Sequence, residues 1–457
     1  MCGIIGIHST IKNEKIFYEI FEGLMCLQHR GQDSVGISNE ECVRKYDGLV
    51  KYAFQHENLD SQPCQNYMGH VRYGTNGLTN NIQPLYTIFP RRISLCHNGN
   101  ITNTQEVKDI IYNTYRILLD TQSDSEIILS LFSCKLYELL NKNGNEITED
   151  KIFIVTNFLH DVLKGSYCLI IIIKDYGMIT VRDKFGIRPL IFGKKENNFV
   201  IASESVALDL LDYDIVRDVK AGETIIFKNK EISPIFNYYM SSSLTPCLFE
   251  YIYFARPDSI IDKINVNEAR ILIGKILGEK MKQLWDCKEI DYIIPVPDTS
   301  VTFANGIQEV IKRPFREGFI KNRYIDRTFI MKNKNIIQQN IKRKLSGIKN
   351  SFKNKNVLIV DDSIVRGNTS KHLIRMIKKY GCKKIYFASC SPIIKNTNNY
   401  GIYIPTREEL ISFNRTEEEI KKELEVDYLI YNNLEPIIDG LKQLNKDIDN
   451  FEISMFL

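Results

Sequence analysis

The sequence predicts two domains, an α+β domain with two sheets and, after it, an α/β domain with a parallel sheet. At 457 residues the chain is long enough for two or three domains. Residues 166–174, 178–182, 199–203 and 223–227 are short apolar stretches typical of strands, which predicts the sheets of the first domain. Residues 357–360 are a Val, Leu and Ile run without alternation, as in a strand that is buried on both faces of a parallel sheet.

The boundary between the domains is expected near residues 238–246, where the serines at 241–243 and Pro246 interrupt the pattern. We therefore assign residues 2–240 to the first domain and 241–457 to the second. Residues 266–285 have the spacing of a long amphipathic helix, and residues 290–300 that of a strand followed by a polar loop.

The composition excludes several classes of protein. It is 44% hydrophobic and 25% charged, as in a soluble globular protein. The longest apolar run, residues 168–173, is far shorter than the roughly 20 residues that span a bilayer, and no secretory signal opens the chain. The 11 cysteines are an odd number without a C-x-x-C pair, which indicates reduced thiols. We expect a cytoplasmic protein without a membrane partner.

Positive charge is concentrated in one segment. The net charge is only +4, but residues 312–355 hold 14 Lys or Arg and two acidic residues. Such a run is typical of a solvated face or a nucleic-acid patch. Aromatic residues are sparse in it, however, and it leads into a loop of phosphate-binding type. An anionic small molecule therefore explains it better than a nucleic acid.

Cys2 is a candidate nucleophile. It becomes the N-terminal residue if Met1 is removed, and we expect no propeptide before it. Its free α-amino group, with a reference pKa of about 8, can then serve as the base for its own thiol, so that no catalytic His is needed. Taken alone, a cysteine at position two is most often incidental.

Polar motifs downstream strengthen this interpretation. After a helical pattern at residues 16–27, they lie at 28–34, 69–75, 97–100 and 121–126, near the ends of predicted elements. Arg72 can clamp a carboxylate, Asp124 can hold an ammonium group, and Asn98 with the Gly99 N–H can bind an oxyanion. Together they predict a pocket for an α-amino acid whose side-chain carbonyl is attacked by Cys2.

Each of these residues also has a purely structural interpretation. Asn98-Gly99 alone favours a hairpin turn. Ser123 and Glu126 fit a capping box, which would make Asp124 a first-turn acid. Arg72 could form a surface ion pair. It is their combination with Cys2 that favours a site.

This constellation resembles the class II glutamine amidotransferase domain, an αββα N-terminal-nucleophile sandwich. Residues 182–190 and 202–209 match later motifs of the same domain. The resemblance implies that Cys2 attacks the glutamine amide and that Asn98 and Gly99 form the oxyanion hole. It also implies that Arg72 and Asp124 bind the α-carboxylate and the α-amino group of glutamine.

The second candidate site follows the strand at residues 357–360. Asp361 and Asp362 end this strand, where open α/β sheets bind ligands, and adjacent acids suit ribose hydroxyls or hydrated Mg2+. The next residues form a loop before a helix, whose free N–H groups attract phosphate. The expected ligand is a sugar phosphate, and the alternative is an ordinary strand end with solvated acids. The loop residues are Ser363, Arg366, Gly367, Asn368, Thr369 and Ser370.

These residues resemble the signature of type I phosphoribosyltransferases that binds phosphoribosylpyrophosphate (PRPP). In that family the acids hold the ribose hydroxyls and the loop holds the 5′-phosphate; Asn368 departs from the more usual Thr. The resemblance implies that Thr299 contacts pyrophosphate and metal, with Asp361 and Asp362 as further metal ligands. Residues 318–330 match the loop that covers PRPP, with Lys321, Arg323 and Arg327 neutralising pyrophosphate.

Residues 247–259 resemble the interdomain segment of one family, glutamine PRPP amidotransferase. The resemblance implies a pentosyltransferase that hydrolyses glutamine and uses the ammonia to convert PRPP to 5-phosphoribosylamine, releasing glutamate and pyrophosphate, the first step of de novo purine synthesis. It implies Mg2+ as cofactor, purine nucleotides as inhibitors, and a homo-oligomer, a dimer or tetramer. Cys247 is placed like an iron–sulfur ligand, but the later C-x-x-C is missing, so no cluster is expected.

Two alternatives remain from the sequence. Other class II amidotransferases carry a sugar isomerase or an ATP-pyrophosphatase domain, but no S-G-G-x-D-S loop is present here. The other alternative is a PRPP- or nucleotide-sensing regulator that uses a phosphoribosyltransferase fold only for binding. Such a regulator needs neither the Cys2 constellation nor a basic covering loop.

Overall fold

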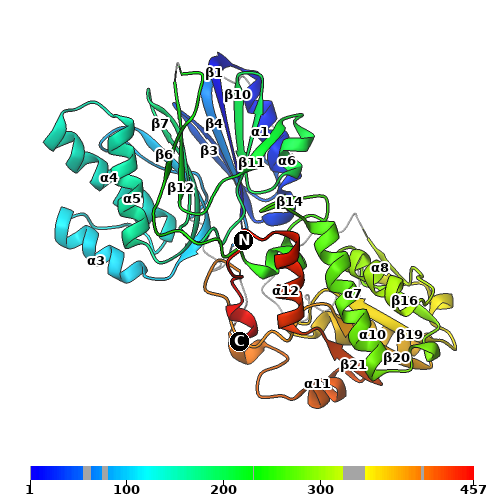
Figure 1. Cartoon of the computed structure of the whole chain (residues 1–457). Coiled ribbons are helices and arrows are strands. Elements are labelled where there is room, and N and C mark those ends of the chain that lie inside the picture. The colour runs from blue at the N-terminus through cyan, green and yellow to red at the C-terminus, as the bar shows by residue number, and fades with distance from the viewer. Residues whose placement is uncertain (1, 55–62, 75–80, 230, 323–344, 403–405) are drawn as a thin grey trace.

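The computed structural model describes residues 2–54, 63–74, 81–229, 231–322, 345–402 and 406–457. Figure 1 shows two halves, with the antiparallel sheets in one and the parallel sheet in the other. The predicted fold class is confirmed, whereas the boundary at residues 240–241 stays a prediction.

The first sheet contains the strand that begins directly after Cys2. Its order is β11-β9-β10-β1-β4-β2-β3, and neighbouring strands are antiparallel. The central strand β1 pairs on one side with β10 and on the other with β4, so Cys2 lies in the middle of this sheet's edge. The bounds are β1 Gly3–Asn13, β2 Ser34–Asn39, β3 Val43–Asp47, β4 Cys64–Arg72, β9 Ile191–Lys195, β10 Asn198–Ala202 and β11 Asp214–Asp218.

The second sheet has the order β13-β12-β8-β7-β6-β5, again antiparallel. Its long strand β7 is the Ile-rich run of the sequence, and both of its faces are buried, which explains the lack of alternation. The bounds are β5 Leu85–Thr87, β6 Ile93–Ile101, β7 Gly165–Ile173, β8 Gly177–Arg182, β12 Glu223–Lys228 and β13 Ile235–Tyr238.

The two sheets pack face to face through an apolar layer that includes Ile4, Met68, Ile170, Met178 and Phe227. Helices α1 (Lys15–Cys26), α2 (Val50–Ala53) and α6 (Val206–Leu210) cover the outer face of the first sheet. Helices α3 (Thr104–Tyr115), α4 (Asp124–Asn143) and α5 (Glu149–Val162) cover that of the second. The layers are therefore αββα.

The second half is built on a parallel sheet of order β16-β19-β20-β21. Its strands are β16 Tyr292–Pro295, β19 Asn356–Asp361, β20 Lys384–Ser389 and β21 Tyr428–Tyr431. Its helices are α7 Val266–Leu284, α8 Ser300–Ile311, α10 Asn368–Lys379, α11 Glu417–Leu424 and α12 Leu434–Leu444, and its short strands are β14 Ile260–Ile261, β15 Ile264–Asn265, β17 Phe319–Lys321 and β18 Leu345–Gly347. The β19–α10–β20 unit places Asp361 at the carboxyl edge, as the sequence predicts.

A short helical segment, η2 (Glu250–Phe254), joins the halves. The last residues of the chain pack beside it: the Leu248 N–H donates to the Glu452 carbonyl at 3.2 Å, and Phe249 contacts Phe456. Cys247 is fully buried here, and burial raises the pKa of its thiol. This thiol is an apolar packing group in the present fold.

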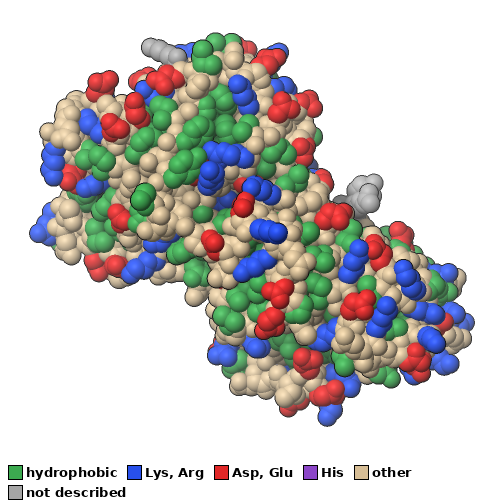
Figure 2. Space-filling view, in the orientation of Figure 1, with side chains coloured by type: hydrophobic (Ala, Val, Ile, Leu, Met, Phe, Trp, Pro, Cys, Tyr) green, Lys and Arg blue, Asp and Glu red, His purple; other side chains and the backbone are tan. Residues whose placement is uncertain are grey.

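Among the described residues, no helix combines the length and the apolar character needed to cross a bilayer. On the face shown in Figure 2, basic and acidic side chains are interspersed over both halves rather than gathered by sign. Charges mixed in this way do not build a large field of one sign over this face.

Candidate active sites

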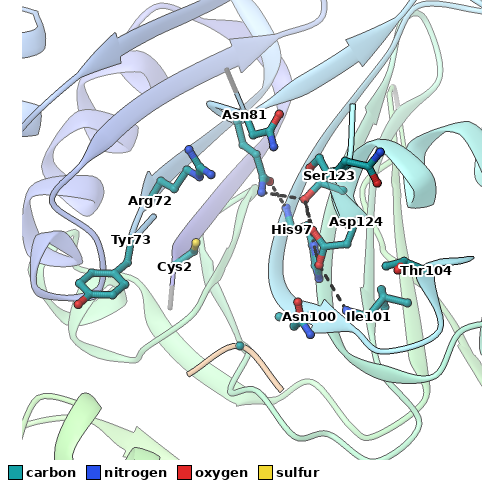
Figure 3. A pocket seen from close by; sticks show the side chains of 15 residues that line it. Cys2, Arg72, Tyr73, Asn81, His97, Asn100, Ile101, Thr104, Ser123 and Asp124 are labelled. Carbon is teal, nitrogen blue, oxygen red and sulfur yellow. Dashed lines mark hydrogen bonds and ion pairs between the residues drawn. The ribbon is translucent and has the colours of Figure 1, made fainter. Parts of the chain in front are cut away.

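A cavity of about 280 Å3 opens in the first half where the two sheets meet, and Cys2 lies at its wall. Figure 3 shows Cys2 and Arg72 on one side of it and His97, Ser123 and Asp124 on the other. The predicted pocket residues Arg72, Gly99 and Asp124 all line the same cavity. The structure thus brings together residues from β4, β6, α4 and the segment before β1.

Cys2 is held by its backbone. Its N atom donates to Asn98 Oδ1 at 3.3 Å, and its carbonyl accepts from Arg30 Nε at 3.1 Å. The Asn98 side chain is buried, and its Nδ2 has no hydrogen-bond partner within the described part of the chain. A buried donor without a partner is costly, and it is the kind of group that an oxyanion would satisfy.

Gly99 lies within strand β6, so the hairpin-turn interpretation of Asn98-Gly99 is wrong. Its φ of 152° favours glycine, and a Cβ here would lie 2.1 Å from the Ser166 carbonyl oxygen. Close approach of β7 to β6 therefore requires a glycine at this position.

Asp124 is the first residue of α4, as a first-turn acid would be. The capping box is absent, because Ser123 makes no side-chain capping bond to its helix. Asp124 Oδ2 accepts from the Ile101 N–H at 3.3 Å and lies 3.6 Å from His97 Nδ1. This carboxylate faces the cavity opposite Arg72, so the two charged ends of an α-amino acid would find opposite partners there.

A hydrogen-bond network that was not predicted from the sequence supports the side of the cavity formed by His97 and Asp124. His97 is buried, and its backbone N–H donates to Gln83 Oε1 at 2.6 Å. Gln83 Nε2 donates to Ser125 Oγ at 2.9 Å, and the same Oγ lies 3.1 Å from His97 Nδ1. His97 and Ser125 lie in the polar motifs at 97–100 and 121–126, so the sequence could have indicated that they belong to the site. Gln83 lies in none of these motifs, and nothing in the sequence indicates its role.

In the second half, Asp361 and Asp362 lie at the carboxyl end of β19, and both are buried. Burial and the neighbouring Asp362 raise the pKa of Asp361. Burial also raises the pKa of Asp362 to about 6, against the opposing effects of Ser363 and Arg270. Two buried carboxyl groups side by side are unfavourable unless a cation or hydroxyl donors reach them. Their oxygens therefore fit both ribose hydroxyls and Mg2+.

The loop after these acids forms the start of α10. Gly367 immediately precedes the helix with a φ of 74°, and a Cβ here would collide with Ile411 at 2.4 Å. Asn368 and Thr369 are exposed in the first turn, so their N–H groups can meet a phosphate. Ser370 is buried, and the Arg366 guanidinium forms an ion pair with Glu409 at 2.8 Å.

The remaining predicted residues of this site come from other segments. Thr299, just before α8, hydrogen-bonds Asp362. Lys321 Nζ lies 2.6 Å from Asp298 Oδ2, which places the end of β17 beside the same loop. Arg323 and Arg327 lie outside the described residues.

Arg270 is a charged group that the sequence did not single out. It lies on α7, is almost fully buried, and donates to the carbonyls of Tyr251 and Ala255, each at 2.8 Å. Burial lowers its pKa to about 10, and its charge favours ionised Asp362. Arg270 therefore binds the interdomain segment directly and acts on Asp362 through its charge.

Two family models match the chain in the same order as the two sites. Residues 70–210 match a glutamine amidotransferase domain, and residues 264–392 match a phosphoribosyl transferase domain. The fold and the sites thus define a glutamine amidotransferase joined to a phosphoribosyltransferase.

Whole-chain comparisons identify the particular family. The amidophosphoribosyltransferases of Pasteurella multocida and Escherichia coli are 41% and 40% identical to this chain, covering 100% of it and 92% of each relative. A solved structure of glutamine PRPP amidotransferase from B. subtilis, in complex with ADP and GMP, has a TM-score of 0.83 at 33% identity, covering 98% of this chain and 94% of that one. The chain belongs to the amidophosphoribosyltransferase family.

Proposed function

We propose that this chain hydrolyses glutamine at Cys2 and uses the ammonia to convert PRPP to 5-phosphoribosylamine, with release of glutamate and pyrophosphate. The observation that carries this proposal is the presence, in one chain, of the Cys2 cavity and of the buried acid pair before the α10 phosphate loop. A regulator that only senses PRPP would have no use for the first of these sites.

At the first site, Cys2 Sγ would attack the side-chain amide carbon of glutamine. With Met1 removed, the α-amino group takes the thiol proton and passes it to the departing ammonia. Asn98 Nδ2 and the Gly99 N–H would stabilise the oxyanion, while Arg72 and Asp124 bind the α-carboxylate and the α-ammonium group. Water then hydrolyses the thioester and releases glutamate.

At the second site, ammonia would displace pyrophosphate from C1 of the ribose. Asp361 and Asp362 would hold the ribose hydroxyls, and the loop at 363–370 would hold the 5′-phosphate. Oxygens of Asp361, Asp362 and Thr299 would also hold Mg2+, and the ion would supply positive charge to neutralise pyrophosphate. Lys321 and Arg323 would bind pyrophosphate through their positive charge. No iron–sulfur cluster is part of this scheme.

The proposal extends to regulation and assembly. The B. subtilis relative was solved with ADP and GMP, which supports purine nucleotides as inhibitors here. We further propose a cytoplasmic homo-oligomer, a dimer or tetramer, that acts in purine synthesis.

A Cys2→Ala variant tests the division of labour between the sites. Wild type should release pyrophosphate with glutamine or with ammonium salts, and the variant only with ammonium. Loss of both activities in a folded variant, or retention of glutamine-dependent release, would contradict the proposal.

A further inference from the structure

The wall of the glutamine cavity includes a residue from the second half of the chain. Gly401 lines the cavity, and a Cβ at this position would lie 3.1 Å from the carbonyl carbon and oxygen of Gly99. One residue along, Asn100 Nδ2 donates to the Asn399 carbonyl at 2.8 Å. Residues 399–401, which we call the docking turn, therefore lie directly against the strand that carries Asn98 and Gly99.

One hydroxyl group joins the docking turn to that strand. Ser166 lies on β7, opposite Asn100 on β6, and is fully buried. Its Oγ accepts from the Asn100 N–H at 3.2 Å and donates to the Tyr400 carbonyl at 2.8 Å. The residue after Gly99 is thus linked through a single side chain to the second half.

Arg188 is a second anchor on the same carbonyl. It is fully buried, and its Nε donates to Tyr400 O at 2.9 Å, with a further contact from Nη2. Its Nη1 donates to Glu250 Oε1 at 3.2 Å, and the same oxygen accepts from Arg30 Nη2 at 2.7 Å. Arg30 also donates to the Cys2 carbonyl. These contacts therefore connect the docking turn, which lies against β6, to the backbone of Cys2.

We propose that Ser166 and Arg188 are positioning residues for glutamine hydrolysis, which hold the docking turn against β6 and so fix Gly99 relative to Cys2. This inference rests on the proposed function. Oxyanion donors act only at hydrogen-bond distance from the developing charge, so a displacement of about 1 Å can cost about 100-fold in rate. Glutamine hydrolysis thereby depends on contact with the second half.

The test compares Ser166→Ala with Ser133→Ala. Ser133 is also buried, but it lies on α4 and its Oγ has no partner among the described residues. Glutamate release gives kcat and KM for glutamine, and ammonium-dependent pyrophosphate release reports on the second site. We expect kcat for glutamine hydrolysis to fall about tenfold in Ser166→Ala, corresponding to about 1.4 kcal/mol. KM for glutamine and ammonium-dependent turnover should stay within about twofold, and Ser133→Ala should match wild type.

Arg188→Lys and the double variant provide a second route. Lysine keeps a positive charge beside Glu250 but cannot reproduce both contacts to the Tyr400 carbonyl. Because both residues act through this carbonyl, the double variant should lose less than the product of the single losses.

Either of two results would overturn the inference: an unchanged kcat in Ser166→Ala, or an equal fall in glutamine- and ammonium-dependent turnover, which indicates a general loss of structure. A wild type that releases no glutamate would instead overturn the proposed function, and the inference with it.

Discussion

The two sites are built in opposite ways. The proposed glutamine cavity is assembled from residues far apart in the chain: Cys2 before β1, Arg72 at the end of β4, Gly99 within β6 and Asp124 at the start of α4. The proposed PRPP site has most of its predicted groups in one stretch, from the end of β19 to the first turn of α10.

This difference decides what holds each site in place. A contiguous strand–loop–helix segment sets most of its own geometry, because its ligand-binding groups follow one another along the backbone. A dispersed site depends on the pairing and packing of several elements, here the β6–β7 register and the docking turn. Substitution of a residue that only holds other elements in place should therefore impair glutamine hydrolysis at the first site more selectively than PRPP turnover at the second.

Gly99→Ala is expected to have the largest effect. A Cβ would collide with the Ser166 carbonyl and displace β6, which carries the proposed oxyanion donors Asn98 and Gly99. Glutamine hydrolysis should therefore fall by about 100- to 1,000-fold. Ammonium-dependent PRPP turnover should persist. Gly144→Ala is the matched control, because Gly144 also has a positive φ but a Cβ there would meet no atom within 4 Å. Similar losses in the two variants would contradict this account of Gly99.

Asp361→Asn should produce the converse pattern. Loss of one charged acceptor for the ribose hydroxyls should raise KM for PRPP about 10- to 100-fold with either nitrogen source. Glutamine hydrolysis measured without PRPP should be unchanged. The control is Asp427→Asn, since Asp427 lies at the opposite edge of the same sheet and accepts from the Ile385 N–H. An unchanged KM for PRPP would remove Asp361 from the site.

Asp218 provides a smaller test at the junction of the halves. It accepts from the N–H groups of Asp262 and Lys263, and burial and nearby Asp262 raise its pKa to about 6. Unfolded Asp ionises near pH 3.9, so between about pH 4 and 6 the folded protein holds a proton that the unfolded chain has lost. Stability should therefore fall as pH rises through this window.

The measurement is Tm against pH for wild type and Asp218→Asn. The variant should lack the part of the decline due to Asp218, about 2–4 °C if that part is worth about 1 kcal/mol. Asp214→Asn, an exposed position on the same strand, should behave as wild type. Identical slopes for wild type and Asp218→Asn would contradict the raised pKa.

Local patterns predicted most of the architecture. The strand expected at residues 166–174 is β7, the helix at 266–285 is α7, and Asp361 is the last residue of β19, with Asp362 directly after it. The contacts between elements could not be predicted in this way. The Ser166–Tyr400 bond joins residues 234 positions apart, and Asn100 and Asn399 are 299 apart. Such contacts depend on the register of the strands and on the docking of the two halves. The spacing of apolar residues along the chain determines neither of these.

Buried charge was also missed. Arg188 and Glu250 lie in the motifs at 182–190 and 247–259, and the structure pairs them. Charged residues are seldom fully buried unless they are paired, and the sequence does not show which residues form a pair. Their pairing appears only when the interdomain segment packs against the first half.

The most direct test of the central claim, that the two sites serve one reaction, is the ratio of glutamate to pyrophosphate released in the same sample of wild type supplied with glutamine, PRPP and Mg2+. If they do, glutamate and pyrophosphate should be released in equal amounts. Glutamate release without pyrophosphate, or pyrophosphate release that is indifferent to glutamine, would contradict it.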